Sequence, residues 1–394
     1  VGPFEVGAGE HSIVLALPSG MVVPVDVGRM EVVRVQGIGQ VERTLTADGF
    51  FQPGQPIEVT LKATTLYGNY TPFIDEVIPE GVEVTNVGTG GQVDGNHILF
   101  SLDPTTSSET VTYTLQPPSG ARFLLFSGLC DGGLPLADTV HGDTSVTNEL
   151  WLFGKSSQDS RDNFDGTAIG SPWIVEYGSD PALSTDYQEG VTISVANGKL
   201  TFGADTQSMA EKFNESNFGR RAPMILRTDL PNGDWRIETQ VKLVDTFTWS
   251  SYVVGLVVAY NEGNDTDVSG DEYLFGFNSS DIRAVLTDSV APSGTLSYHE
   301  YTLEADWLQE LLLAGKISAK LAVTRRAGEL IFSAQLPDRN WQLVGAPVAE
   351  TRTVTRVGIV SEISGTENFT IAEYDYFLLS TLDTFTDVTA WDLY

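Results

Sequence analysis

The sequence predicts an all-β protein, and three observations support that prediction. Short runs of β-branched and aromatic residues recur at roughly ten-residue intervals along the chain. Gly, Pro, Asn and Asp separate these runs, as is typical of turns between strands. No unit of 20 to 50 residues repeats, so the sequence does not favour a solenoid or a propeller. With 394 residues the chain exceeds one ordinary hydrophobic core, and two domains are expected.

The candidate strands either alternate apolar and polar residues or run as continuous apolar stretches. In chain order they are Ser12–Leu17, Met21–Val27, Ile57–Ala63, Gly81–Val87, His97–Leu102, Glu109–Leu115, Arg236–Val244, Tyr252–Tyr260, Lys320–Arg325 and Arg356–Ser361. One segment departs from this pattern, because Leu308, Leu311 and Leu312 follow a helical spacing and Gly315 suits a helix end. We therefore expect one short helix near residues 304–315.

Two breaks divide the chain. One lies near Gly37–Gly39, and the other is the polar stretch Lys155–Ser160. These breaks predict an N-terminal β segment at 1–36, an immunoglobulin-like sandwich at 37–150, a larger jelly-roll sandwich at 161–380 and a C-terminal tail at 381–394.

The charge of the chain excludes some partners. Its 22 basic residues face 53 acidic ones, for a formal net charge of −31, and this field repels nucleic acids and anionic lipid surfaces. No apolar run approaches the roughly 20 residues that a membrane-spanning helix needs. Cys130 is the only cysteine, so an intrachain disulfide or a thiolate metal cluster cannot form.

The region from 41 to about 143 resembles the immunoglobulin-like repeats of bacterial surface and secreted proteins. Its matching segments are Phe51–Pro56 before Ile57–Leu61, Ile78–Gly81 before Val82–Val84, Val111–Leu115 and Phe126–Gly128. The resemblance implies a spacer or an adhesive unit outside the cell.

The region from 162 to 379 resembles the concanavalin A-like lectin and glucanase sandwiches, in particular the C-terminal domain of β-xylosidase-type enzymes. The matching segments are Asp162–Gly166, Trp173, Asn197–Phe202, Leu230–Thr239, Val254–Val258, Ala322–Arg326, Asn340–Gly345, Val357–Ile359 and Tyr374–Phe377. In those enzymes the domain flanks a sugar site built mainly by another domain, and no such domain precedes it here. The resemblance therefore implies contact with carbohydrate only indirectly.

No catalytic constellation stands out in the sequence. The four histidines are isolated, and neither a zinc motif nor a serine-hydrolase elbow is present. A glycosidase needs two facing carboxylates, for which Glu238, Glu272 and Glu373 lie in strand-like context. His299 is the nearest candidate for a polysaccharide lyase. Each of these residues is also explained as an ordinary strand residue, so no catalytic residue is assigned.

Aromatic side chains offer a candidate sugar platform, because their faces cover the C–H faces of pyranose rings. The candidates are Trp249, Tyr252, Tyr273 and Phe275. Tyr273 and Phe275 share one face of their strand. The alternative is that these rings fill the core between the two sheets.

Calcium is the expected ion, since it prefers oxygen ligands and sandwiches of this type often bind it where the first and last strands meet. By that resemblance, the ligands would be Asp162, Asn163, Asp165 and Asp375.

Three hypotheses follow. The leading one is a secreted or cell-surface, non-catalytic binding or adhesion protein that recognises a polysaccharide or surface glycan through the jelly-roll domain. The second is a structural subunit of an extracellular filament or surface layer, which self-associates by donating its N-terminal strands to a neighbour. The third is a polysaccharide-degrading glycosidase or lyase.

Overall fold

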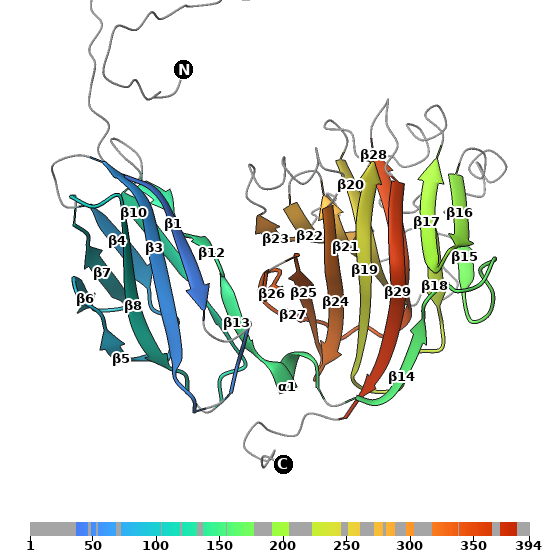
Figure 1. Cartoon of the computed structure of the whole chain (residues 1–394). Coiled ribbons are helices and arrows are strands. Elements are labelled where there is room, and N and C mark those ends of the chain that lie inside the picture. The colour runs from blue at the N-terminus through green and yellow to red at the C-terminus, as the bar shows by residue number, and fades with distance from the viewer. Residues whose placement is uncertain are drawn as a thin grey trace, which may run out of the picture. The chain divides into compact units, whose positions relative to one another are not determined.

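Figure 1 shows the computed structural model of the chain. It describes residues 37–45, 49–52, 54–67, 72–103, 105–118, 120–131, 137–154, 156–176, 191–204, 223–245, 251–260, 272–278, 281–287, 297–302, 317–337, 339–364 and 371–383. The predicted N-terminal segment at 1–36, the predicted helix near 304–315 and most of the tail lie outside the described residues. Among the described residues, no helix is long and apolar enough to cross a membrane.

The protein is nearly all β, as predicted, and it divides into two compact units. The described residues of 37–46, 56–117 and 125–144 form the first unit, and those of 47–55, 118–124 and 145–383 form the second. The sequence-based boundaries placed all of 37–150 in one domain. In the structure, three short segments of that range pack with the second unit instead.

The first unit contains two five-stranded sheets. The β3 sheet has the order β12 (His141–Gly142), β1 (Gly37–Leu45), β3 (Ile57–Tyr67), β8 (Ser108–Gln116) and β5 (Glu83–Val87). The β4 sheet has the order β11 (Ala137–Thr139), β10 (Ser127–Asp131), β4 (Phe73–Val77), β7 (His97–Ser101) and β6 (Gly91–Asp94).

Alternating side chains hold these two sheets together. Leu61 and Tyr113 of the β3 sheet and Ile98 and Phe100 of the β4 sheet are at most 1% exposed. The rings of Phe100 and Tyr113 lie 6.2 Å apart between the sheets. The first unit is therefore a β-sandwich, while its immunoglobulin-like character stays a prediction.

The second unit contains a larger sandwich. Its nine-stranded sheet has the order β16 (Val191–Ala196), β17 (Lys199–Ala204), β29 (Ile371–Leu382), β19 (Trp235–Asp245), β24 (Ile317–Arg326), β25 (Glu329–Gln335) and β26 (Trp341–Leu343). Two further strands belong to this sheet: β14 (Ser156–Asp162) pairs with β29, and β27 (Val348–Ala349) pairs with β25. Its seven-stranded sheet runs β15 (Ile174–Glu176), β18 (Met224–Arg227), β28 (Val354–Ser364), β20 (Ser251–Tyr260), β21 (Glu272–Asn278), β22 (Asp281–Thr287) and β23 (Ser297–Thr302).

Aromatic and branched side chains fill the space between these two sheets. Phe332 of β25 contacts the rings of Tyr273 and Phe275 of β21, with centroids 5.4 and 5.2 Å away. At Gly255 a Cβ atom would lie only 2.7 Å from Cδ1 of Leu321 on the opposite sheet. Glycine at this position therefore lets the leucine pack fully, and the two antiparallel sheets form a jelly-roll type sandwich (Figure 1).

A small three-stranded sheet and one helix complete the second unit. The sheet contains β2 (Phe50–Phe51), β13 (Ser145–Asn148) and β9 (Phe123–Leu125), and the helix is α1 (Glu149–Leu152). The Asn148 side chain caps α1 by accepting from the Trp151 backbone N–H at 3.2 Å. Trp151 and Leu152 pack on Ile331 and Leu343, so these segments belong to the larger unit.

Two predicted boundaries fall within strands of the structure. The polar stretch Lys155–Ser160 was predicted to be a break, but most of it forms the strand β14. Most of the β14 side chains are exposed, and its backbone pairs with β29 along the whole strand, so a hydrophobic pattern was not required. The predicted start of the tail at 381 also falls inside β29, whose Leu382 is 5% exposed.

Candidate functional site

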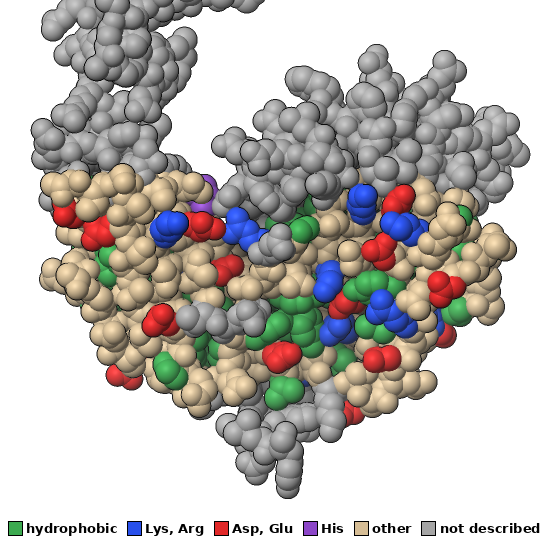
Figure 2. Space-filling view, in the orientation of Figure 1, with side chains coloured by type: hydrophobic (Ala, Val, Ile, Leu, Met, Phe, Trp, Pro, Cys, Tyr) green, Lys and Arg blue, Asp and Glu red, His purple; other side chains and the backbone are tan. Residues whose placement is uncertain are grey.

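The outer face of the nine-stranded sheet carries a row of polar side chains. Ile237, Val241 and Leu243 of β19 point into the core, so the alternate residues Glu238 and Gln240 face outward. The strand register aligns Tyr376, Gln240, Lys320 and Gln335 across β29, β19, β24 and β25. Figure 2 shows Lys and Arg side chains among acidic ones on this face.

A groove of about 320 Å³ opens beside this row. It is lined by Gln240, Ser318, Ala319, Lys320, Gln335, Leu336, Pro337 and Arg339. The Gln335 side-chain amide donates to the Arg339 backbone carbonyl at 3.2 Å, which fixes one wall. The described lining residues thus include two cations, two amides and a hydroxyl, but no carboxylate.

The buried carboxylate of Glu238 lies on β19, two residues before Gln240, which lines the groove. The Tyr376 hydroxyl donates to one oxygen of Glu238, and the Arg236 guanidinium donates to the other. Burial, followed by the Glu238 charge, raises the pKa of Tyr376, which therefore stays a neutral donor. The Arg161 guanidinium lies 3.9 Å from the Tyr376 ring centroid. Both Glu238 oxygens are thus engaged, and the cluster stiffens this face.

The other candidate carboxylates give the enzyme hypothesis no support. Glu373 is paired with Lys199, whose ammonium lies 2.8 Å from its carboxylate. Glu272, at the start of β21, is only 8% exposed. His299 lies on β23, but its side chain is outside the described residues. Glu238 and Glu373 are thus both engaged by basic side chains.

The predicted sugar platform does not form from the residues whose side chains are described. Tyr273 and Phe275 are 2% and 0% exposed in the core, where both contact Phe332. Neither ring offers a face to a ligand. Tyr252 lies on β20, but its side chain is outside the described residues, as is the whole of Trp249.

The predicted calcium ligands are engaged by nitrogen donors. Asp162 accepts from the Phe164 backbone N–H at 2.8 Å and from the Trp173 indole N–H at 2.7 Å. Asp375 lies 3.4 Å from the Lys199 ammonium. No group of three or more His, Cys, Asp or Glu residues suited to a metal occurs among the described residues. The calcium site stays a prediction.

Asn163 and Asp165 complete the predicted ligand set. The Asn163 side-chain oxygen accepts from the Arg161 guanidinium at 2.7 Å. One Asp165 carboxylate oxygen lies 3.5 Å from the place that a Cβ of Gly198 would take. Asp162 is thus the last residue of β14, Asn163 and Asp165 lie in the loop that follows it, and the hydrogen bonds of Asp162 and Asn163 stabilise the start of that loop.

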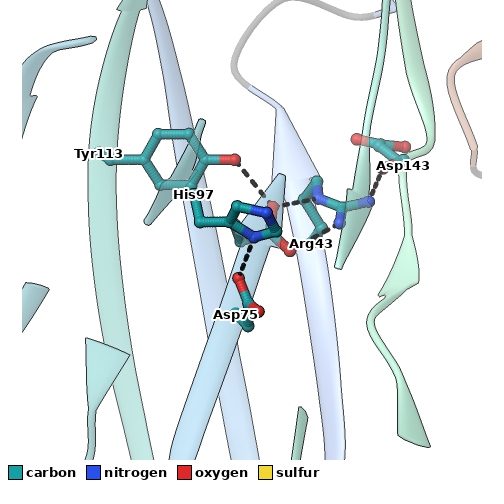
Figure 3. A network of polar contacts seen from close by, with 6 residues as sticks. Arg43, Asp75, His97, Tyr113 and Asp143 are labelled. Carbon is teal, nitrogen blue, oxygen red and sulfur yellow. Dashed lines mark hydrogen bonds and ion pairs between the residues drawn. The ribbon is translucent and has the colours of Figure 1, made fainter. Parts of the chain in front are cut away.

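Sequence reasoning missed a buried polar network in the first unit (Figure 3). The Arg43 guanidinium donates to both oxygens of Glu76, at 3.0 and 2.7 Å, and to the Asp143 carbonyl at 2.9 Å. The Tyr113 hydroxyl donates to Glu76 at 2.8 Å. The sequence pattern indicated that Arg43 is buried, because it alternates with the apolar residues Val41 and Leu45, and both of these are buried. This network is enclosed, so it serves the fold rather than a ligand.

Comparison with known proteins gives a likeness of fold only. No family model matches the chain, and no curated protein matches it. Solved structures with a similar arrangement include concanavalin A-like lectin and glucanase sandwiches.

Three of these structures show the degree of similarity to this chain. A protein described with endo-acting O-glycanases of the human gut microbiota is 12% identical, covers 57% of this chain and 99% of its own, and has a TM-score of 0.37. An endo-β-galactosidase from Clostridium perfringens is 14% identical, covers 56% and 62%, and has a TM-score of 0.38. Lectin I-B4 from Griffonia simplicifolia is 16% identical, covers 57% and 100%, and has a TM-score of 0.35. Such TM-scores carry no inference about function.

Proposed function

We propose that the protein is a non-catalytic, extracellular or cell-surface binding protein that holds a glycan on the outer face of its nine-stranded sheet. The observation that carries this proposal is the groove beside Lys320, which is lined by polar donors and lacks a carboxylate among its described lining residues. In a chain of net charge −31, a groove with two cations is a local exception. The first unit would act as a spacer.

The chemistry of the lining fits a sugar polymer that bears acidic groups. The amides of Gln240 and Gln335 and the hydroxyl of Ser318 match sugar hydroxyls as donors and acceptors. The Lys320 ammonium, which forms no ion pair with a described residue, matches a carboxylate or a sulfate. Leu336 and Pro337 add apolar surface for C–H faces. The volume is at the lower end of the range for ligand sites, roughly 300 Å³, so it fits one or two sugar rings.

The surroundings of the nearest carboxylate favour binding of a glycan over its hydrolysis. Glu238 is the candidate acid beside the groove, and both of its oxygens accept from Arg236 and Tyr376. Glycoside hydrolysis needs two carboxylates that face each other, and the described lining of the groove contains none.

The test is retention of the full chain on insoluble polysaccharides, one a polyuronate and one uncharged. We expect retention on the polyuronate that weakens as salt rises, because ion pairs are screened. Lys320→Met should weaken binding about tenfold, the value of one charge-assisted hydrogen bond. Lys62→Met is the matched control, since Lys62 is exposed on β3 of the first unit.

Several outcomes would contradict the proposal. Equal retention of wild type and Lys320→Met would show that the groove is not the binding site. Absence of retention on every polysaccharide would show that the protein does not bind these glycans. Release of reducing ends would show an enzyme instead. Repeating the retention with calcium and with a chelator tests the calcium prediction, which requires a difference between the two.

A further inference from the structure

One edge of the first sandwich is open along the start of β1. On one side β1 pairs with β3 from Gly37 to Leu45. On the other side, among the described residues, only β12 pairs with it, in parallel and only at Glu42 and Arg43. The stretch from Gly37 to Val41 therefore has no strand partner on that side within the described part of the chain.

The hydrogen bonds of Arg43 and Leu45 show which backbone groups of β1 point toward this open side. The Arg43 carbonyl accepts from the Asp143 N–H, and the Leu45 N–H donates to the Asp143 carboxylate, both at 3.0 Å. Residues two apart in a strand point their N–H and C=O groups the same way. The groups of Gly37, Gly39 and Val41 thus point outward, away from β3.

This edge lacks the usual protection against strand addition. Sheet edges are normally guarded by charged residues, proline, a bulge or a covering segment. The sequence Gly-Ile-Gly-Gln-Val at 37–41 contains no charge and no proline. Its glycines present no side chain to an approaching strand. The edge is thus suited to pairing with one more strand.

The chain itself contains a segment with the composition of such a strand. Ile13–Leu17 is a run of five apolar residues without proline or charge, as is typical of segments that add to sheet edges. The second apolar run, Met21–Val27, is less suitable because it contains Pro24 and Asp26. Nineteen residues, 18–36, separate Leu17 from Gly37, and they can span up to roughly 65 Å.

The length of this connection favours a second copy as the acceptor. If Ser12–Leu17 returned to its own β1, residues 18–36 would form a long loop, and loops beyond about 15 residues are uncommon in compact domains. Pairing with another copy instead makes residues 18–36 a linker between two copies, which is the role in which long segments of this kind usually occur.

We propose that Ser12–Leu17 of one copy adds as a strand to the Gly37–Val41 edge of β1 in a second copy. Each copy then supplies one donor segment and one acceptor edge. A head-to-tail contact of this kind builds a chain of copies unless the rotation between copies closes a ring. This association is independent of the glycan groove, which lies in the second unit.

Light scattering on the full chain over a range of concentrations tests the proposal. Buffer of about 0.15 M salt or more screens repulsion between the acidic copies. We expect the average mass to rise with concentration for wild type and to remain that of a monomer for Val14→Pro, because proline removes a ladder hydrogen bond. Val23→Pro, the same change in the second apolar run, should behave as wild type.

Mixing two variants identifies the two partners of the contact. Gly39→Pro removes an outward N–H of the acceptor edge and keeps the donor, whereas Val14→Pro keeps the edge and loses the donor. Each alone should be monomeric, and their equimolar mixture should form dimers but no longer chains. Should Gly39→Pro fail to fold, excess Val14→Pro should shorten wild-type assemblies, since it accepts a donor and offers none.

The contrary results are equally clear. A wild-type chain that stays monomeric at every concentration overturns the proposal, as does association that survives Val14→Pro. Loss of association in Val23→Pro alone would assign the donor to the other run and contradict the assignment made here. A mixture that stays monomeric while both variants unfold at the wild-type temperature also defeats it.

Discussion

Each unit contains an arginine–glutamate ion pair, and the two pairs lie on opposite sides of their sheets. In the first unit, Arg43 and Glu76 are 0% exposed and face the interior of the sandwich. In the second, Arg236 and Glu238 are 16% and 11% exposed and lie on the outer face of the nine-stranded sheet. The interior of the second sandwich is filled by apolar and aromatic side chains.

This difference separates two uses of charge. A charge inside a sandwich is tolerated only if every donor and acceptor is satisfied, and the Arg43 network meets that demand with Glu76, Tyr113 and Asp143. Charges on an outer face carry a smaller desolvation cost. They can therefore line a groove and exchange water for a ligand, as we propose for Lys320.

The largest expected effect comes from breaking the interior pair. Glu76→Gln should lower the free energy of unfolding of the first unit by about 3–5 kcal/mol, since it leaves the Arg43 charge buried without its partner. Chemical denaturation with hydrogen exchange at β3 and β8 amides measures this loss. The double replacement Arg43→Met with Glu76→Leu should cost less than Glu76→Gln alone, and a larger cost would contradict this account.

The corresponding change on the outer face should be smaller. Glu238→Gln should lower the free energy of unfolding of the second unit by roughly 1 kcal/mol, because Arg236 retains access to water. The same denaturation experiment compares the two variants directly. Equal losses for Glu76→Gln and Glu238→Gln would show that the difference in burial has no energetic consequence.

The smallest effect concerns acid stability of the second unit. Burial opposes the ionisation of Glu350, but hydrogen bonds from the Arg352 side chain and backbone outweigh it, so the pKa of Glu350 is lowered. Its folded state binds fewer protons than the unfolded state, so its stabilisation is present above about pH 4.3 and is lost as the pH falls further.

Thermal unfolding from pH 6 to pH 3 measures this contribution. Wild type should lose more stability than Glu350→Gln over that interval, with a difference below about 1 kcal/mol. Parallel losses in the two proteins would mean that other carboxylates account for the acid sensitivity.

The strands were predictable from the sequence because their side chains alternate. The predicted run Arg236–Val244 is β19 within one residue at each end, and Tyr252–Tyr260 is nearly all of β20. β14 was missed, since an exposed edge strand is held by backbone pairing with β29 and needs no apolar side chains. The helix α1 was missed as well, because four residues are too few for a helical period.

The candidate site was harder to predict than the fold. The sequence places Tyr273 and Phe275 on one face of a strand, and their shared contact with Phe332 confirms it. A period of two residues does not tell which face is the interior, so the sequence left both a sugar platform and the core open for these rings. The groove combines residues from β19, β24 and the end of β25, and only strand register brings Gln240, Lys320 and Gln335 together.

The strand β29 has a consequence for how the protein is made. It is the last described strand of the chain, yet it lies between β19 on one side and β14 with β17 on the other. During synthesis, β14, β17 and β19 are made before β29, so the larger sandwich lacks the strand with which all three pair until β29 is made. Completion of this unit thus requires β29, and a chain that stops before Ile371 would leave β14, β17 and β19 without their shared neighbour.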